Sequence, residues 1–124
     1  VGLFDESLGT CWEDYDLCLR LTGAGWHLAT VGDAHVEHWH GATTGRVSPY
    51  ITYYFTRNRL ICLSRYGRPP GTLRSLPRLA RTFWWQINGY GLGNWTCHAA
   101  FLKGILHFLL GVRGLGAPPK QRKG

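Results

Sequence analysis

The chain has 124 residues, enough for one small domain with a hydrophobic core and too few for two. Its net charge of +7 is unevenly distributed: all seven acidic residues lie at or before Glu37, and Arg20 is the only Lys or Arg in that part. The acid-free remainder suits a polyanion, a phosphorylated substrate or an anionic membrane surface. The four cysteines form no C-x-x-C pair, which disfavours zinc ribbons and redox dithiols and favours buried free thiols.

The chain contains no Met and opens on V-G-L-F-D-E, a sequence typical of the middle of a domain. We therefore expect it to be part of a longer translation product. No signal peptide is visible at its start, and one could belong to the missing part.

The first predicted helix lies within residues 13–26. Leu17 and Leu21 are four residues apart, the acids at its front complement the helix dipole, and Arg20 lies near its end. Gly23 and Gly25 are expected to stop it. Residues 27–32 and 34–40 then predict two short extended segments, joined by a turn at Gly32 and Asp33.

A loop over 41–49 precedes a second predicted helix, from about Pro49 to Arg65, with Gly67 just past its end. Residues 72–112 are helical in tendency, interrupted by Pro77 and by the glycines of N-G-Y-G-L-G-N (88–94). The apolar stretch 99–112 is too short and too polar for a bilayer span, and fits an interfacial or packed helix.

The acidic cluster W-E-D-Y-D (12–16) is the first candidate for chemistry. A carboxylate at the start of a helix is favoured as the anion, and at the edge of a cleft it can accept a proton from an attacking hydroxyl. Stabilisation of the helix N-terminus alone is the simpler explanation of the same pattern.

Two further groups have both a functional and a structural explanation. The segment H-V-E-H-W-H (35–40) puts four potential metal ligands within six residues, but on a strand they alternate between faces, and a polar strand end explains them equally. Arg57 and Arg59, with Asn58, could hold a phosphate through the planar guanidinium, or they could form an exposed helix face.

Taken in order, these motifs resemble a known family. G-L-F-D-E (2–6), W-E-D-Y-D-L-C-L-R-L (12–21), G-W (25–26), A-H-V-E-H-W-H-G-A-T (34–43) and Y-Y-F-T-R-N-R-L (53–60) are similar to the carboxyl-terminal half of family 2 glycosyltransferases. The likeness is strongest with the rhamnosyltransferase-like branch. It covers about residues 2–60, and its specificity comes from five motifs in order, since each alone would be weak.

The resemblance implies an inverting glycosyltransferase in which Asp14 is the catalytic base. Asp14 would deprotonate an acceptor hydroxyl as that oxygen attacks the anomeric carbon of a nucleotide-sugar in a single displacement. Trp12, Glu13, Asp16 and Arg20 match motif positions, with Glu13 on the acceptor side or supporting, and Asp16 and Arg20 as scaffold support.

The resemblance also implies a divalent metal, Mg²⁺ or Mn²⁺, held mainly by a D-x-D motif in a nucleotide-binding half that this sequence lacks. His38 is the candidate ligand within the chain, and Arg57 and Asn58 are candidate phosphate contacts. The insert S-L-G-T-C (7–11) is smaller and more polar than the family's aromatic insert, and Thr43 and Thr44 replace its Ser. Without a donor site, the chain alone is expected to be inactive.

The predicted fold is therefore α/β, the C-terminal part of a GT-A fold followed by a mostly helical extension. We expect an acceptor-side portion at 1–66, a helical and membrane-associated extension at 67–116 and a basic disordered tail at 117–124. The expected partners are a nucleotide-sugar donor, a saccharide or lipid-linked acceptor and the cytoplasmic face of the cell membrane. Alternatives are a non-catalytic basic module that binds nucleic acid, which the acids at 13–16 disfavour, and a membrane-surface helical protein without an active site.

Overall fold

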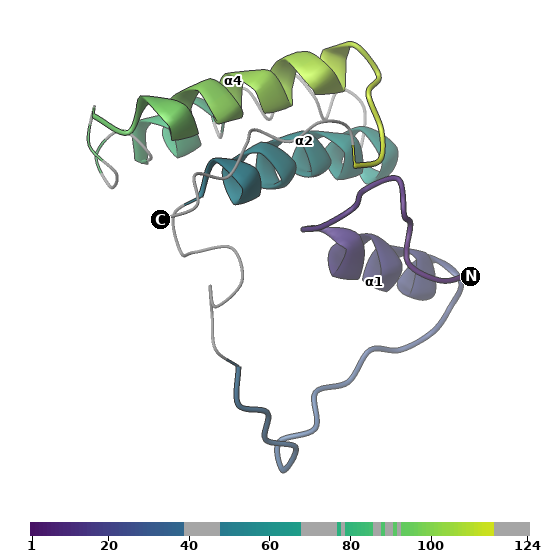
Figure 1. Ribbon diagram of the computed structural model, residues 1–124. Coiled ribbons are helices and arrows are strands. Elements are labelled where there is room, and N and C mark those ends of the chain that lie inside the picture. Colours follow the sequence, from purple (N-terminus) through teal and green to yellow (C-terminus); the bar gives the residue numbers. More distant parts are fainter. Residues whose placement is uncertain are drawn as a thin grey trace.

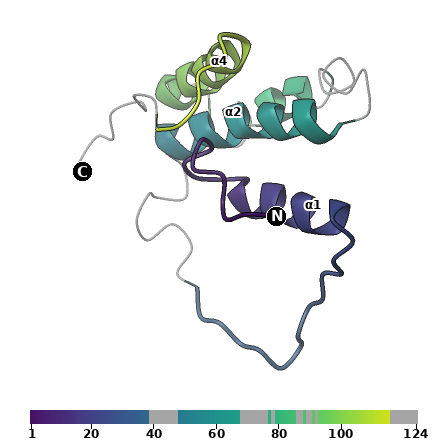
Figure 2. The same ribbon diagram turned by 90° about the vertical axis from the view of Figure 1, so that its right-hand side faces the viewer.

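The computed structural model describes residues 1–38, 48–67, 77, 79–85, 88, 91 and 93–115. Its regular structure is helical: α1 (Glu13–Gly23), α2 (Pro49–Tyr66) and α4 (Trp95–Leu109), with further helical residues at 79–85. Helix α2 lies in the middle, with α4 along one side of it and α1 on the other (Figures 1 and 2).

The predicted α/β fold is wrong for the part of the chain that the structure describes, which is all-helical and contains no strand. Residues 27–38 are extended and exposed rather than paired, and they run away from the helices (Figures 1 and 2). A strand needs a neighbour to receive its backbone hydrogen bonds, and none of the described segments offers one. The turn at Gly32 and Asp33 is present, closed by a bond from the Ala34 N–H to the Val31 carbonyl (3.3 Å). Residues 39 and 40 of the second predicted segment lie outside the described residues.

The predicted helix boundaries agree closely with the structure. Helix α1 starts at Glu13 and ends at Gly23. Helix α2 starts at Pro49, after Ser48 accepts a hydrogen bond from the Tyr50 N–H (3.2 Å), and it ends at Tyr66. Residues 117–124 lie outside the described residues, and the domain boundaries stay predictions.

Helix α2 is buried around most of its circumference because three groups of residues pack on it. Leu8 joins Ile61 and Cys62, Ala100 of α4 joins Tyr53 and Tyr54, and Phe101 and Leu79 join Leu60. One core therefore unites the N-terminal loop, α2, α4 and the helical residues 79–85.

A polar chain also links the two long helices. The Arg57 guanidinium donates to the Tyr53 hydroxyl (3.3 Å), and Tyr53 lies 2.7 Å from His107 Nδ1 on α4. Because arginine can only donate, the Tyr53 hydroxyl is oriented to donate to a neutral His107. Burial, aided by the charges of Lys103 and Arg57, lowers the pKa of His107 and favours that neutral form.

Helices α2 and α4 approach most closely at Gly104. A Cβ added there would lie 2.9 Å from the Tyr53 carbonyl oxygen and 3.1 Å from Thr56 Cβ. The nearest atom belongs to the backbone of α2, so only a shift of one helix against the other could relieve the contact.

We predict that Gly104→Ala destabilises the fold by about 1 to 2 kcal/mol, because an overpacking cost of up to about 3 kcal/mol outweighs the roughly 1 kcal/mol that Ala gains over Gly in a helix. Thermal and urea unfolding measure the change. Gly23→Ala is the matched control, since nothing lies within 4 Å of a Cβ at Gly23. Equal stability of Gly104→Ala and the wild type would contradict this packing.

Candidate functional site

The loop before α1 is held in an uncommon backbone conformation. Cys11 and Trp12 have φ values of 64° and 71°, in the left-handed region that residues other than glycine rarely adopt. Such conformations persist only where surrounding contacts enforce them, and they concentrate at functional sites. The two residues stand directly before Glu13 and Asp14.

Asn58 of α2 is one of the groups that enforce this conformation. Its fully buried amide nitrogen lies 2.9 Å from the Leu8 carbonyl oxygen, 2.7 Å from that of Thr10 and 2.9 Å from that of Cys11. One side chain therefore gathers three carbonyls of the loop onto α2.

Arg57 joins the same loop to the end of the described chain. Its guanidinium donates to the carbonyl oxygens of Leu8 (2.8 Å) and Gly114 (2.7 Å), and its Nε donates to Asn58 Oδ1 (3.0 Å). The side chain is fully buried, with the rings of Tyr53 and Tyr54 at 5.4 and 4.9 Å. Phosphate binding by Arg57 and Asn58 stays a prediction, and the contacts described here give the pair a structural role.

The three acids of the α1 first turn differ in their surroundings. Asp14 is exposed, and its Oδ1 accepts a hydrogen bond from the Tyr15 N–H (2.8 Å). Glu13 is half-buried, and Asp16 is fully buried. Each residue of a helix is rotated by about 100° about the axis relative to the one before it. Asp14 and Asp16, two residues apart, therefore lie on nearly opposite faces of α1.

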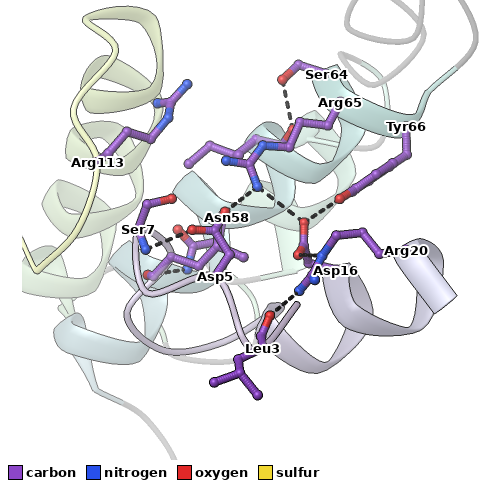
Figure 3. Close-up of polar contacts among 12 residues, drawn as sticks. Leu3, Asp5, Ser7, Asp16, Arg20, Asn58, Ser64, Arg65, Tyr66 and Arg113 are labelled. Atoms are coloured by element: carbon purple, nitrogen blue, oxygen red, sulfur yellow. Dashed lines mark hydrogen bonds and ion pairs between the residues drawn. The ribbon is translucent and has the colours of Figure 1, made fainter. Parts of the chain in front are cut away.

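Asp16 is the centre of an ion-pair network between α1 and the end of α2 (Figure 3). Its carboxylate accepts hydrogen bonds from Arg20 Nε (2.9 Å), Arg65 Nη1 (3.2 Å) and the Tyr66 hydroxyl (2.6 Å). Burial alone would raise the pKa of Asp16, but the hydrogen bonds from Tyr66 and Arg20 and the Arg20 charge outweigh it, so the pKa is lowered.

Arg65 extends this network to Asp5, with which it forms a second ion pair. The hydrogen bonds from Ser7 and Arg65 lower the pKa of Asp5 to about 2. Arg20 in turn donates to the Leu3 carbonyl oxygen (2.7 Å) and fixes the first residues of the chain. The sequence assigned no role to Asp5, Arg65 or Tyr66, although Asp5 lies in the G-L-F-D-E motif, because their partners across the ion-pair network are distant along the chain.

Two polar atoms beside Asp14 are left without a partner in the described part of the chain. They are the indole Nε1 of Trp12 and the Oε2 of Glu13, both buried. Buried polar groups are normally hydrogen-bonded, so these two atoms, which are closed to solvent, are unsatisfied exceptions next to Asp14 in the sequence. The Trp12 ring is packed edge-to-face on Tyr15 and Phe55, which limits its movement.

The described residues do not assemble a metal site. None of them belongs to a group of three or more His, Cys, Asp or Glu side chains able to hold an ion. His38 is exposed at the end of the extended segment 27–38, which leaves the helices (Figure 1). The role of His38 as a metal ligand stays a prediction.

Comparisons with protein-family models, with curated proteins and with solved structures find no match to this chain. No helix in the described ranges is long and apolar enough to cross a membrane.

The Asp16 network predicts a loss of stability in acid. The pKa values of Asp5 and Asp16 are lower in the folded chain than the roughly 3.9 of an unfolded aspartate. Their contribution is therefore complete above about pH 4 and is lost as the pH falls through the folded values, near 2 for Asp5. Urea unfolding between about pH 5 and pH 2 measures this.

Asp16→Asn should lower the free energy of unfolding by about 1 to 3 kcal/mol at pH 7 and flatten the acid dependence, because an uncharged amide replaces the buried carboxylate that accepts from the half-buried Arg20, the exposed Arg65 and Tyr66. Asp33→Asn, at an exposed position, should behave as the wild type. The same acid dependence in Asp16→Asn as in the wild type would contradict the role of this carboxylate.

Proposed function

We propose that this chain forms the acceptor side of an inverting glycosyltransferase, with Asp14 as the general base. The observation that supports it best is the placement of Asp14, an exposed carboxylate at the first turn of α1 beside two left-handed residues. The ordered likeness of residues 2–60 to family 2 glycosyltransferases supplies the reaction type. The proposal concerns the chemistry of residues 2–60 and does not include the α/β fold that the structure contradicts.

The proposed step is a proton transfer coupled to displacement. An acceptor hydroxyl loses its proton to an Asp14 carboxylate oxygen as the hydroxyl oxygen forms a bond to the anomeric carbon of the donor sugar. The bond from that carbon to the donor diphosphate breaks, and the diphosphate leaves with the electron pair. Attack from the face opposite the leaving group inverts the anomeric configuration.

The neighbours of Asp14 support acceptor binding. In this proposal Trp12 Nε1 donates to a sugar oxygen and Glu13 Oε2 accepts from a second hydroxyl after a movement of the two side chains, since both atoms are closed to solvent in this structure. An indole face also suits the apolar face of a sugar ring, although Trp12 is already packed against two aromatic rings. Asp16 is fully occupied by Arg20, Arg65 and Tyr66, and in this proposal it holds α1 in place.

In this proposal the donor site and most ligands of the divalent metal are supplied by residues other than those described, with His38 as the candidate ligand among the described ones. One histidine cannot hold a divalent ion by itself, and the described residues contain no group of side chains that would complete the coordination of the ion. We therefore derive no step through a metal.

Asp14→Asn should abolish sugar transfer while leaving donor binding intact, because the amide keeps the shape of the carboxylate but cannot accept the proton. The expected loss in kcat is at least about 100-fold. It is measured as nucleoside diphosphate release by the native protein that carries this segment, with nucleotide-sugar affinity measured by calorimetry.

Asp33→Asn is the matched control, because it makes the same change at an exposed aspartate outside α1. Turnover close to that of the wild type in Asp14→Asn would exclude Asp14 as the base. Equal loss in both variants would show an effect of surface charge rather than of proton transfer.

A further inference from the structure

Helix α4 is apolar on two opposite faces. Cys97, Ala100, Phe101 and Gly104 are buried against α2. On the far side, Trp95, Leu102, Leu106 and Leu109 follow one another at spacings of seven, four and three residues and so form one stripe. We call these four residues the outer face of α4.

The outer face is open to solvent. Its side chains are exposed by 70 % for Trp95, 58 % for Leu102, 52 % for Leu106 and 71 % for Leu109. A helix that is apolar around its whole circumference is normally covered on all sides, and a contiguous exposed apolar surface marks an interaction site.

Further exposed tryptophans lie in the segment that packs beside α4. Phe83 stacks on Phe101 of α4, with ring centroids 5.2 Å apart, and the next two residues, Trp84 and Trp85, are both exposed. Tryptophan favours the boundary between hydrocarbon and water, because its ring is apolar while its N–H needs a polar partner.

The charge distribution decides which partner fits. Every acidic residue belongs to the first 37 residues, and α1, which carries three of the seven, lies on the opposite side of α2 from α4 (Figures 1 and 2). The part of the chain that contains α4 has basic residues only, including the exposed Arg81 and Arg113. A second copy, itself at +7, would be repelled, whereas an anionic surface would be attracted.

We propose that the outer face of α4 binds an anionic lipid bilayer, with the helix lying in the interface. At 15 residues α4 is about 22 Å long, shorter than the roughly 30 Å hydrocarbon core, so it lies along the surface. The leucines and Trp95 enter the headgroup region, and the acid-free chain supplies attraction to lipid phosphates. This proposal does not depend on glycosyl transfer.

The test is co-sedimentation of the 124-residue chain with vesicles. We expect binding to vesicles of equal parts phosphatidylcholine and phosphatidylglycerol, weaker binding to phosphatidylcholine alone, and a decrease with added salt. The triple variant Leu102→Gln, Leu106→Gln, Leu109→Gln should bind the anionic vesicles at least about 100-fold more weakly, because three exposed leucines no longer leave water.

The matched control is Leu3→Gln, Val31→Gln, Val36→Gln, which removes as many exposed apolar side chains outside α4. It should bind the anionic vesicles as the wild type does. Asp14→Asn should also bind normally, so failure of the proposed catalysis and failure of membrane binding remain distinguishable. Circular dichroism checks that each variant is folded.

A second measurement uses single, mild substitutions. Brominated lipids should quench the fluorescence of Trp95 on the outer face, so Trp95→Phe should reduce the quenched fraction, while Trp26→Phe in the exposed extended segment should not. Three results would each overturn the proposal. The first is equal vesicle binding by the outer-face variant and the wild type, and the second is loss of quenching in Trp26→Phe only. The third is a wild-type dimer that does not bind vesicles and that dissociates when the outer-face leucines are replaced.

Discussion

The structure depends on a buried pair of neighbouring side chains, Arg57 and Asn58, in the middle of α2. Together they bind backbone carbonyls of Leu8, Thr10 and Cys11, and Arg57 also binds that of Gly114. Carbonyls buried under a helix need donors, and a guanidinium beside an amide supplies several from two adjacent positions. The loop that contains Trp12 and leads into Asp14 therefore keeps its conformation because these two side chains of α2 bind its carbonyl groups.

The acidic cluster combines a structural and a proposed chemical role within one helical turn. Asp16 is buried and bound by Arg20, Arg65 and Tyr66, so it anchors α1 to α2. Asp14, two residues earlier, faces solvent. The anchoring of one carboxylate keeps the other in a fixed place, which is what a general base requires. On the opposite side of α2, α4 adds a separate apolar surface to a molecule whose acids are all in its first 37 residues.

Local signals in the sequence predicted the helices well, because Pro49, Gly67 and the acidic first turn act within a few residues of the ends they mark. The two predicted strands do not form over the described residues 27–38, because strand formation depends on a partner that a local pattern cannot supply. Arg57 and Asn58 were singled out, yet their partners lie about 50 residues away and sequence spacing gives no sign of that proximity. The different faces of Asp14 and Asp16 were foreseeable from their spacing, but which of them would be buried depended on Arg65 and Tyr66.

Hydrogen exchange of Asn58→Ala compared with the wild type tests most directly whether α2 holds the loop that presents Asp14. Loss of the amide leaves the carbonyls of Thr10 and Cys11 without this donor, while the carbonyl of Leu8 keeps its bond from Arg57, so the account predicts faster exchange at the amides of residues 8–16. The amides of α4, which Asn58 does not contact through these bonds, should exchange at nearly their wild-type rate. Unchanged exchange over residues 8–16 in a folded Asn58→Ala variant would contradict the central role of this side chain.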